Sequence, residues 1–188
     1  MKKIGFKISG IIISVLFVLL CVNINYSAII DMQNPTCVGL DTLFDYLPDD
    51  MKAGVTTFEG VAERVFDFNK KIIDSVYDIV PSVKVQIAYY EMYGHYGVRA
   101  LEKTIRYAKL KGMFVITDGK RNDIGATMEA YTNAHLGTTA VGDNISEAFG
   151  ADALTVNGYL GTDGIAPLLK VCKEKDKGIY VLVKTSNP

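Results

Sequence analysis

The stretch MFVITDGKRNDIGAT, residues 113–127, joins an apolar run directly to a dense group of charges. Its first five residues, Met113 to Thr117, have the continuous apolar and β-branched character of a strand buried on both faces of a parallel sheet. Alternate residues of a strand share one face, so Asp118 and Lys120 leave its end on the same side, separated by Gly119. We therefore predict a buried strand that carries two opposite charges at its carboxyl end.

The residues after this strand suit the start of a helix. Asp123 follows within a tight turn, where it is placed to cap a helix that includes Thr127, Met128 and Ala130. Taken alone, the D-x-K-x-x-D spacing is a weak pattern, because a solvated turn with one ion pair and one helix cap has the same letters. The rest of the chain has to decide between a functional site and such a turn.

From residue 34 onward the chain alternates short apolar runs with longer segments of helical period, which predicts a β/α alternation. Apolar residues at i, i+3 and i+4 spacing predict helices within residues 58–80, 97–112 and 164–178. No repeat or linker divides residues 34–188, so they form one predicted domain. The predicted strands are Thr36–Leu40, Val83–Ala88, Met113–Thr117, Ala153–Val156 and Ile179–Val183.

Parallel strands joined by helices form either an open doubly wound sheet or a closed eight-stranded barrel. The segment CVGLDTLFD, residues 37–45, has one glycine where a dinucleotide fingerprint needs three, which disfavours the open sheet with a cofactor. We therefore expect an α/β fold of the TIM (β/α)8 type. A complete barrel takes about 250 residues, so we expect this chain to be an N-terminal portion that contains about five of the eight strands.

Three other predicted strand ends carry polar side chains. Asp41 ends the first strand, Lys84 lies in the second, and Ser186 follows the fifth. A lysine buried in a sheet is costly unless an anion pairs with it, so a carboxylate such as Asp118 is the expected neighbour of Lys84. The alternative for Lys84 is a surface position at a strand start. Because the carboxyl ends of barrel strands face the catalytic mouth, this set favours an active site.

Together these segments resemble the orotidine 5′-phosphate decarboxylases, in the subgroup of bacteria that have the longer form of the enzyme. The resemblance covers residues 34–188. It implies the conversion of orotidine 5′-phosphate to uridine 5′-phosphate and CO2 in pyrimidine nucleotide synthesis, with no cofactor and no metal. The segments that carry it are NPTCVGLD, VKVQIAYYE, DGKRNDIGAT, ADALTVNGYLGTDG and YVLVKTSNP, in that order along the chain.

The resemblance implies that Lys84, Asp118, Lys120 and Asp123 form a row of alternating charges around the reacting carbon. Asp118 would lie near the departing carboxylate. Lys120 would stabilise the carbanion at C6 of the pyrimidine and then protonate it. Lys84 would hold the aspartates ionised and aligned.

The same resemblance implies substrate contacts outside this row. Asp41 would bind a ribose hydroxyl, and Ser186 would contact the pyrimidine edge. Asp123 and Thr127 would reach into the site of a partner subunit, which implies a homodimer. Asn157, which lies near the mouth, receives no role.

Two positions depart from the family, because this chain has Val85 and Gly158 where the family usually has proline. Neither change touches a charged group. The family binds the substrate phosphate through a glutamine and an arginine that follow the sixth strand. Since binding energy from a remote phosphate is used in the transition state, we expect this chain alone to be inactive or nearly so.

Composition excludes some other functions. The 20 basic and 21 acidic residues nearly cancel and no run of five or six like charges occurs, so we expect no nucleic-acid partner. Cys21, Cys37 and Cys172 lie far apart, and neither histidine has a metal-ligand spacing from them. We expect reduced thiols, with Cys37 buried, no disulfide and no zinc, and hence the cytoplasm.

Residues 1–30 disagree with a cytoplasmic location. They have a basic start, an apolar stretch and a small polar exit, as signal peptides do. Residues 8–24 are a weak candidate for a membrane anchor. A wrongly assigned start codon or a joined reading frame would also explain this leader, and a membrane contact is expected only if the leader is real.

Two rival functions remain open at this stage. Related barrels use the same D-x-K-x-x-D pattern with Mg²⁺ to act on sugar phosphates, but they carry an acidic residue where this chain has Lys84, and a cation there repels the metal. The second rival is a non-catalytic, membrane-tethered fragment, which the leader and the short barrel both favour.

Overall fold

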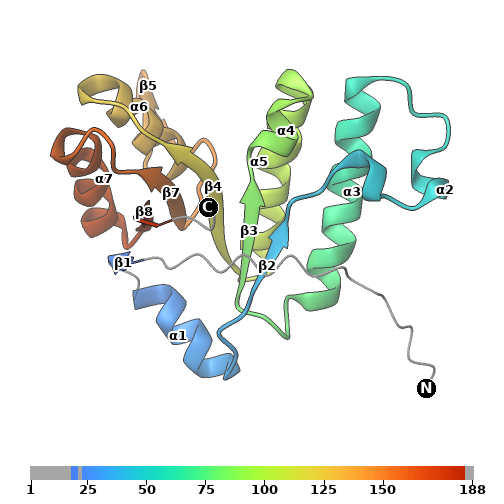
Figure 1. Cartoon of the computed structure of the whole chain (residues 1–188), viewed down its shortest axis with the longest axis horizontal. Coiled ribbons are helices and arrows are strands. Elements are labelled where there is room, and N and C mark those ends of the chain that lie inside the picture. Colours follow the sequence, from blue (N-terminus) through green and yellow to red (C-terminus); the bar gives the residue numbers. More distant parts are fainter. Residues whose placement is uncertain (1–17, 21–22, 185–188) are drawn as a thin grey trace.

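The computed structural model describes residues 18–20 and 23–184. The fold is built around one six-stranded sheet of order β1-β8-β7-β4-β3-β2, with helices between the successive parallel strands (Figure 1). The strands of this sheet are β1 Val18–Leu20, β2 Cys37–Leu40, β3 Ser82–Gln86, β4 Phe114–Arg121, β7 Ala153–Asn157 and β8 Gly178–Leu182. The helices are α1 Asn23–Met32, η1 Phe44–Tyr46, α2 Asp49–Lys52, α3 Phe58–Val76, α4 Ala88–Glu91, α5 Gly94–Leu110, α6 Gly125–His135 and α7 Thr162–Lys175.

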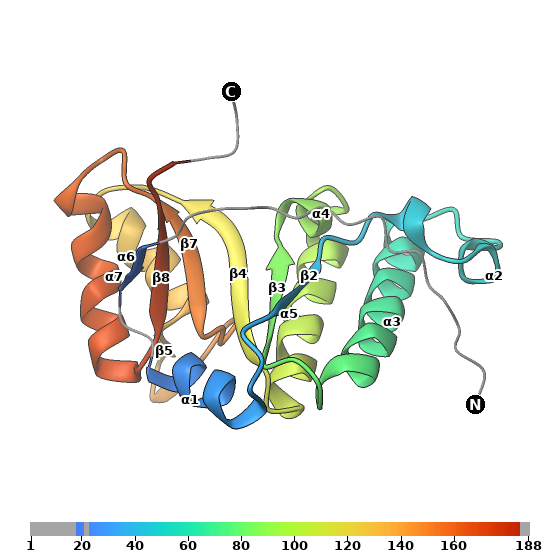
Figure 2. The same ribbon diagram turned by 60° about the horizontal axis from the view of Figure 1, so that its bottom comes forward.

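Strands β2, β3, β4, β7 and β8 pair parallel with one another and lie side by side in the order in which the chain makes them. A doubly wound sheet would reverse its strand order at a switch point, whereas a barrel does not. Figure 2 shows these strands side by side, with their carboxyl ends toward the same side of the molecule. The described sheet is therefore part of a β/α barrel, as predicted, with five parallel strands.

The predicted strands are present, with two instructive shifts in their bounds. The second strand ends at Gln86, because the chain enters α4 at Ala88. The third continues past Thr117 to Arg121, so the charged residues lie within β4 and not after it. Both shifts occur at carboxyl ends, where tertiary contacts override the local apolar pattern.

Two hydrophobic clusters hold the helices against the sheet. In the first, α3 and α5 pack together over β2 to β4 with fully buried Ile73, Leu101 and Ile105. Helix α3 begins where the Thr57 hydroxyl accepts a hydrogen bond from the Gly60 N–H at 3.1 Å. The second cluster joins α6 and α7 to β7 and β8 through Met128, Leu136, Leu154, Val156, Leu168, Cys172 and Ile179.

The expected burial of Cys37 is wrong. This residue is exposed at the start of β2, and only Leu40 in that strand is buried. The physical reason is the position of β2 at an end of the described sheet, where the strand has a neighbour on one side only. A continuous apolar run was therefore a poor guide to burial in this strand.

The chain also forms a hairpin that the sequence analysis did not predict. Strands β5 (Thr139–Val141) and β6 (Asn144–Ser146) pair antiparallel around Gly142 and Asp143. Gly142 has φ of 59°, which suits the first position of a two-residue turn. All six strand residues are exposed.

Most of the predicted leader lies outside the described residues, including residues 1–17 and 21–22. Of the described part, Val18–Leu20 forms β1, antiparallel to β8, and α1 follows it. No helix within residues 18–20 and 23–184 combines the length and apolar character needed to cross a membrane.

Candidate active site

The carboxyl ends of β2, β3 and β4 bring three charged side chains into contact. Lys84 Nζ lies 2.9 Å from Asp41 Oδ1 and 3.0 Å from Asp118 Oδ2. These residues lie far apart in sequence, and the parallel pairing of the three strands places them side by side. The contact expected between Lys84 and Asp118 is present, so Lys84 is a paired lysine within the sheet and not a surface residue.

Lys120 extends this row to a fourth charge. Its Nζ lies 2.6 Å from Asp118 Oδ1, which places the two side chains on the same side of β4, as predicted. The lysine side chain remains 48% exposed, whereas that of Asp118 is only 9% exposed. The row therefore runs from a partly buried pair to an ammonium group that a bound molecule could contact.

Strand β4 contains an irregularity at these residues. Thr117 pairs with Leu154 of β7, but the next pair joins Arg121 to Val156, so β4 has extra residues against its neighbour. Within this bulge Lys120 has φ of 48°, a left-handed conformation that costs a non-glycine residue roughly 1 kcal/mol or more. At Gly119 a Cβ would lie 2.7 Å from Ile87 Cδ1, so any larger residue there would have to displace the end of that side chain.

The charges in the row stabilise one another. Burial raises the pKa of the Asp118 carboxyl, but the hydrogen bond from Lys120 and the charge of Lys84 outweigh it and hold the pKa below its usual value. Burial lowers the pKa of the Lys84 ammonium, and the carboxylates of Asp118 and Asp41 more than reverse this effect. Both residues are thus charged at neutral pH.

Two residues of the site were missed by the sequence analysis. Gln86 Nε2 donates to Asp118 Oδ2 at 3.0 Å, and the Thr155 hydroxyl donates to Asp118 Oδ1 at 2.8 Å. Gln86 could have been found, because alternation along β3 places it on the same face as Lys84. Thr155 gave no such signal, since its role depends on how β7 pairs with the bulge.

A buried polar network lies beside Asp41. The Thr42 hydroxyl donates to Asn69 Oδ1 at 2.6 Å, and Asn69 Nδ2 donates to the Tyr90 hydroxyl at 2.8 Å. All three side chains are buried. Burial, with the charge of Asp41 contributing, raises the pKa of Tyr90 and keeps its hydroxyl neutral. The network ties α3 and α4 to the loop that follows Asp41.

The predicted cap at Asp123 is wrong. Helix α6 begins at Gly125, and Ile124 in the N-cap position makes no side-chain hydrogen bond. The Asp123 carboxylate accepts a hydrogen bond from the Ile124 N–H at 2.8 Å, one residue along, because the chain turns through Gly125 with φ of 50°. Thr127 is exposed on the first turn of α6.

The remaining predicted residues contribute less to the described site. Ser186 lies outside the described residues. Asn157 Oδ1 accepts a hydrogen bond from the Tyr159 N–H at 2.8 Å, which shapes the turn after β7. Within the described residues, neither Asp123 nor Thr127 makes a hydrogen bond or ion pair with the row of charges. Asp123 lies on the β4–α6 connection, and Thr127 lies on the first turn of α6.

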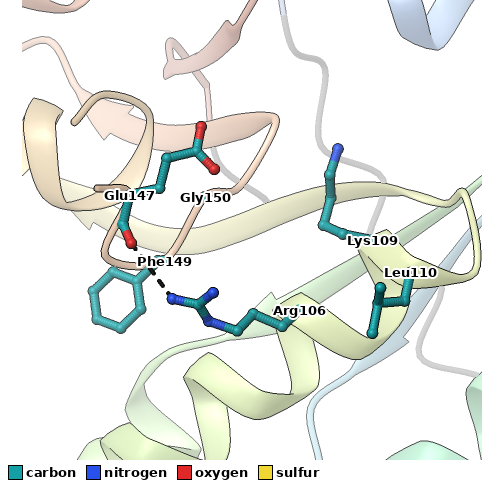
Figure 3. A pocket seen from close by; sticks show the side chains of 6 residues that line it. All are labelled: Arg106, Lys109, Leu110, Glu147, Phe149 and Gly150. Atoms are coloured by element: carbon teal, nitrogen blue, oxygen red, sulfur yellow. Dashed lines mark hydrogen bonds between the residues drawn. The ribbon is translucent and has the colours of Figure 1, made fainter. Parts of the chain in front are cut away.

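A groove of about 350 Å³ lies elsewhere, between the end of α5 and the segment that precedes β7 (Figure 3). The Arg106 guanidinium donates to the Glu147 carbonyl at 3.4 Å across it. Lys109 on its wall pairs with Asp152, which precedes the amino end of β7. The groove thus lies at the amino ends of the strands, opposite the row of charges, and takes no part in the candidate site.

Enzymes built on parallel β/α barrels carry their active sites at the carboxyl ends of the strands. The row of charges in this chain lies at that end of its partial barrel, which is the arrangement of the β/α-barrel enzymes. Residues 35–188 match the family described as orotidine 5′-phosphate decarboxylase / HUMPS. The chain belongs to this family.

The chain is also similar to individual proteins. It is 43% identical over 164 residues to the orotidine 5′-phosphate decarboxylase of Rhodopirellula baltica, covering 86% of this chain and 53% of that one. A Streptomyces avermitilis structure matches with a TM-score of 0.71 and 32% identity, covering 91% and 56%. The Leishmania donovani OMP decarboxylase structure matches with a TM-score of 0.65 and 26% identity, covering 87% and 54%. The chain thus spans about half the length of the relatives it matches.

Proposed function

We propose that this chain supplies the charged part of an active site that decarboxylates orotidine 5′-phosphate. The single observation that carries the proposal is the continuous row Asp41–Lys84–Asp118–Lys120, built by three neighbouring strands. A solvated turn at D-x-K-x-x-D would hold Asp118 and Lys120 alone. It would not explain a buried Asp118 that also contacts a lysine on the next strand.

The row suits a reaction that develops negative charge on carbon. The C6–carboxylate bond breaks, CO2 departs, and the electron pair remains at C6, where Lys120 Nζ stabilises it and then donates a proton. Asp118 lies beside the position of the departing carboxylate and remains ionised, because its lowered pKa leaves it charged at neutral pH. Fixed charges in a water-poor site lower such a barrier without solvent reorganisation, typically by about 3 to 4 kcal/mol for one group.

Lys84 distinguishes this proposal from metal-dependent sugar-phosphate chemistry. Its ammonium group occupies the space between the carboxylates of Asp41 and Asp118, where a divalent cation would need those same oxygens. A fixed positive charge there repels Mg²⁺. The arrangement favours the decarboxylase over the magnesium enzyme.

The proposal includes a nucleotide substrate and a second subunit. Asp41 would hold a ribose hydroxyl and Ser186 the pyrimidine edge. Asp123, on the β4–α6 connection, and Thr127, on the first turn of α6, would reach the site of a partner in a homodimer. Residues that bind the substrate phosphate would come from beyond β8, and the cytoplasm is the location that goes with this proposal.

Complementation tests the proposed function. The chain is produced alone, and together with the part of the Rhodopirellula baltica relative that it does not match. CO2 release from orotidine 5′-phosphate labelled in its carboxylate is then measured. We expect release from the combined proteins, little from either part, and no change on adding a chelator. A soluble, assembled complex without release contradicts the proposed function, and release that requires Mg²⁺ supports the sugar-phosphate alternative.

A further inference from the structure

Thr155 lies opposite the bulge of β4. It is 1% exposed, and its neighbours Leu154 and Val156 pair with Thr117 and Arg121 on either side of the irregularity. Thr155 is therefore the residue of β7 that faces the extra residues of β4. Its side chain lies beside the part of the β4 backbone, between Thr117 and Arg121, where the regular pairing with β7 is interrupted.

The Thr155 hydroxyl makes two hydrogen bonds of opposite sense. Its oxygen accepts from the Lys120 N–H at 2.9 Å, and its proton goes to Asp118 Oδ1 at 2.8 Å. The two directions follow from the chemistry of the partners, because a backbone N–H can only donate and an ionised carboxylate can only accept. One hydroxyl group thus links the backbone of Lys120 to the carboxylate of Asp118.

This link closes a small ring of contacts. The Lys120 ammonium reaches back to the same Oδ1 atom of Asp118, at 2.6 Å. Lys120 also has the left-handed φ of 48°, which a lysine keeps only where its surroundings favour it. The other oxygen of Asp118 is held separately by Lys84 and Gln86. Removal of the Thr155 hydroxyl would therefore loosen one side of Asp118 and the backbone of Lys120 together.

We propose that Thr155 is a positioning residue, whose hydroxyl holds Lys120 in its left-handed conformation and directs its ammonium group toward the reacting carbon. Thr155 acts through Asp118 and Lys120 and does not touch the reacting atoms. The part of this inference that concerns the reaction rests on the proposed function. The part that concerns the hydrogen bonds does not.

Thr117 provides a matched control for packing. It is also a fully buried threonine, on β4 where that strand pairs with β7, and its hydroxyl donates to the Ala153 carbonyl at 3.2 Å. Unlike the hydrogen bonds of Thr155, this one goes to the backbone alone. Thr155→Val and Thr117→Val each replace a buried hydroxyl by a methyl group, whereas Thr155→Ser keeps the hydroxyl.

The first experiment needs no catalytic activity. In the full chain, NMR follows the carboxyl carbon of Asp118 through a pH titration and the hydrogen exchange of the Lys120 amide. In Thr155→Val we expect a higher pKa of Asp118 and at least about tenfold faster amide exchange, because both lose a hydrogen-bond partner. Thr155→Ser should restore both values, and Thr117→Val should change neither. An unchanged pKa and exchange rate in Thr155→Val overturn the proposal, as do equal changes in Thr117→Val.

The second experiment uses the complemented enzyme of the proposed function. We expect kcat to fall about 10- to 100-fold in Thr155→Val, with KM within about threefold of the unmutated value, because a small misplacement of Lys120 weakens the transition state and not substrate binding. Thr155→Ser should recover kcat to within about threefold. A normal kcat in Thr155→Val overturns the reaction part. If the unmutated complex is inactive, the proposed function fails, and the NMR result alone decides the role of the hydroxyl.

Discussion

Two aspartates, one at the carboxyl ends of the strands and one at their amino ends, have similar surroundings. Each side chain is almost buried, and each contacts two lysines. Asp118 lies at the carboxyl end of β4, with its side chain 9% exposed, and Asp152 precedes the amino end of β7, with its side chain 3% exposed. Their other hydrogen-bond partners differ. This difference indicates that the ion cluster around Asp152 stabilises the fold, whereas the cluster around Asp118 serves the reaction.

The partners of Asp152 join segments of backbone. One oxygen accepts from the Val115 N–H at 2.9 Å, while the main chain of Asp152 bonds to Val115 and to Gly178. The other oxygen pairs with Lys109 of α5 and with Lys177, 3.5 Å away, next to β8. Asp152 thus links β4, β7, β8 and α5 at one point, and its carboxylate is neutralised by the two lysines that take part in these links.

The partners of Asp118 are side chains. Besides its two lysines, it accepts hydrogen bonds from Gln86 and Thr155, and Lys84 continues the row to Asp41. The row ends at a half-exposed ammonium group on a strained backbone, where residues that serve a reaction are often found. We therefore expect changes around Asp118 to affect the reaction and changes around Asp152 to affect stability.

The largest effect is expected from Lys120→Ala. In the complemented enzyme this change should lower decarboxylation about 100- to 1,000-fold, because it removes the group that stabilises and protonates C6. The free energy of unfolding should change by less than about 1 kcal/mol, since the lysine is half exposed and such ion pairs stabilise little. Turnover assays and urea unfolding measure the two effects. Uridine 5′-phosphate should still bind, and near-normal turnover would refute the assigned role.

Asp152→Ala should show the reverse pattern. We expect the free energy of unfolding to fall by about 3 kcal/mol, because the change leaves Lys177 and the Val115 N–H without their buried partner. Turnover per folded molecule should stay within about threefold. Urea unfolding of the chain measures the first quantity, with Lys120→Ala as the control at the other end of the sheet. Equal losses of stability in the two variants would remove the distinction between the clusters.

His135 should make the amino end of the sheet sensitive to acid. It is 3% exposed and stacks on Phe149, and burial, with the charge of Arg121 contributing, lowers its pKa from 6.5 to about 4. Above pH 6.5 the ring is neutral in both states, so its full contribution to stability is present. As the pH falls from 6.5 to about 4, only the unfolded chain binds the proton, and the folded state loses up to about 3 kcal/mol.

Urea unfolding at pH 7 and pH 4.5 tests this contribution. His135→Phe keeps a ring against Phe149, and within the described residues the His135 Nδ1 atom has no hydrogen-bond partner to lose. We expect this variant to lose most of the pH dependence. The Asp118 pKa lies below the ordinary 3.8, so that carboxylate contributes only at lower pH and does not confuse the result. An equally steep dependence in His135→Phe would assign the acid sensitivity to other groups.

The same contrast shows what the sequence can predict. Local patterns were sufficient for the five parallel strands and for α3, α5 and α7, because periods of two and 3.6 residues report burial directly. They also placed Asp41, Lys84 and Asp118 at one edge, since parallel strands end together. The exposed hairpin carried a readable signal as well, a glycine at the first turn position between Val141 and Asn144.

The bulge and its consequences could not be read from the sequence. The left-handed Lys120 and the hydrogen bonds of Thr155 depend on pairing between strands that are 35 residues apart along the chain. Long-range register decided both details. The cap predicted at Asp123 failed for a local reason, because the chain turns through Gly125 with φ of 50° and α6 begins there, with Ile124 in the N-cap position.

The smallest effect on stability is expected from Asp123→Ala. An aspartate at the N-cap would contribute about 1 kcal/mol. Within the part of the chain that the structure describes, however, this carboxylate accepts a hydrogen bond only from the adjacent Ile124 N–H, and it lies partly exposed. We therefore expect the free energy of unfolding to change by less than about 0.5 kcal/mol. If Asp123 instead serves a partner's site, turnover of the complemented dimer should fall although stability does not. A stability loss of 1 kcal/mol or more would restore the cap and weaken the case for a role across the dimer.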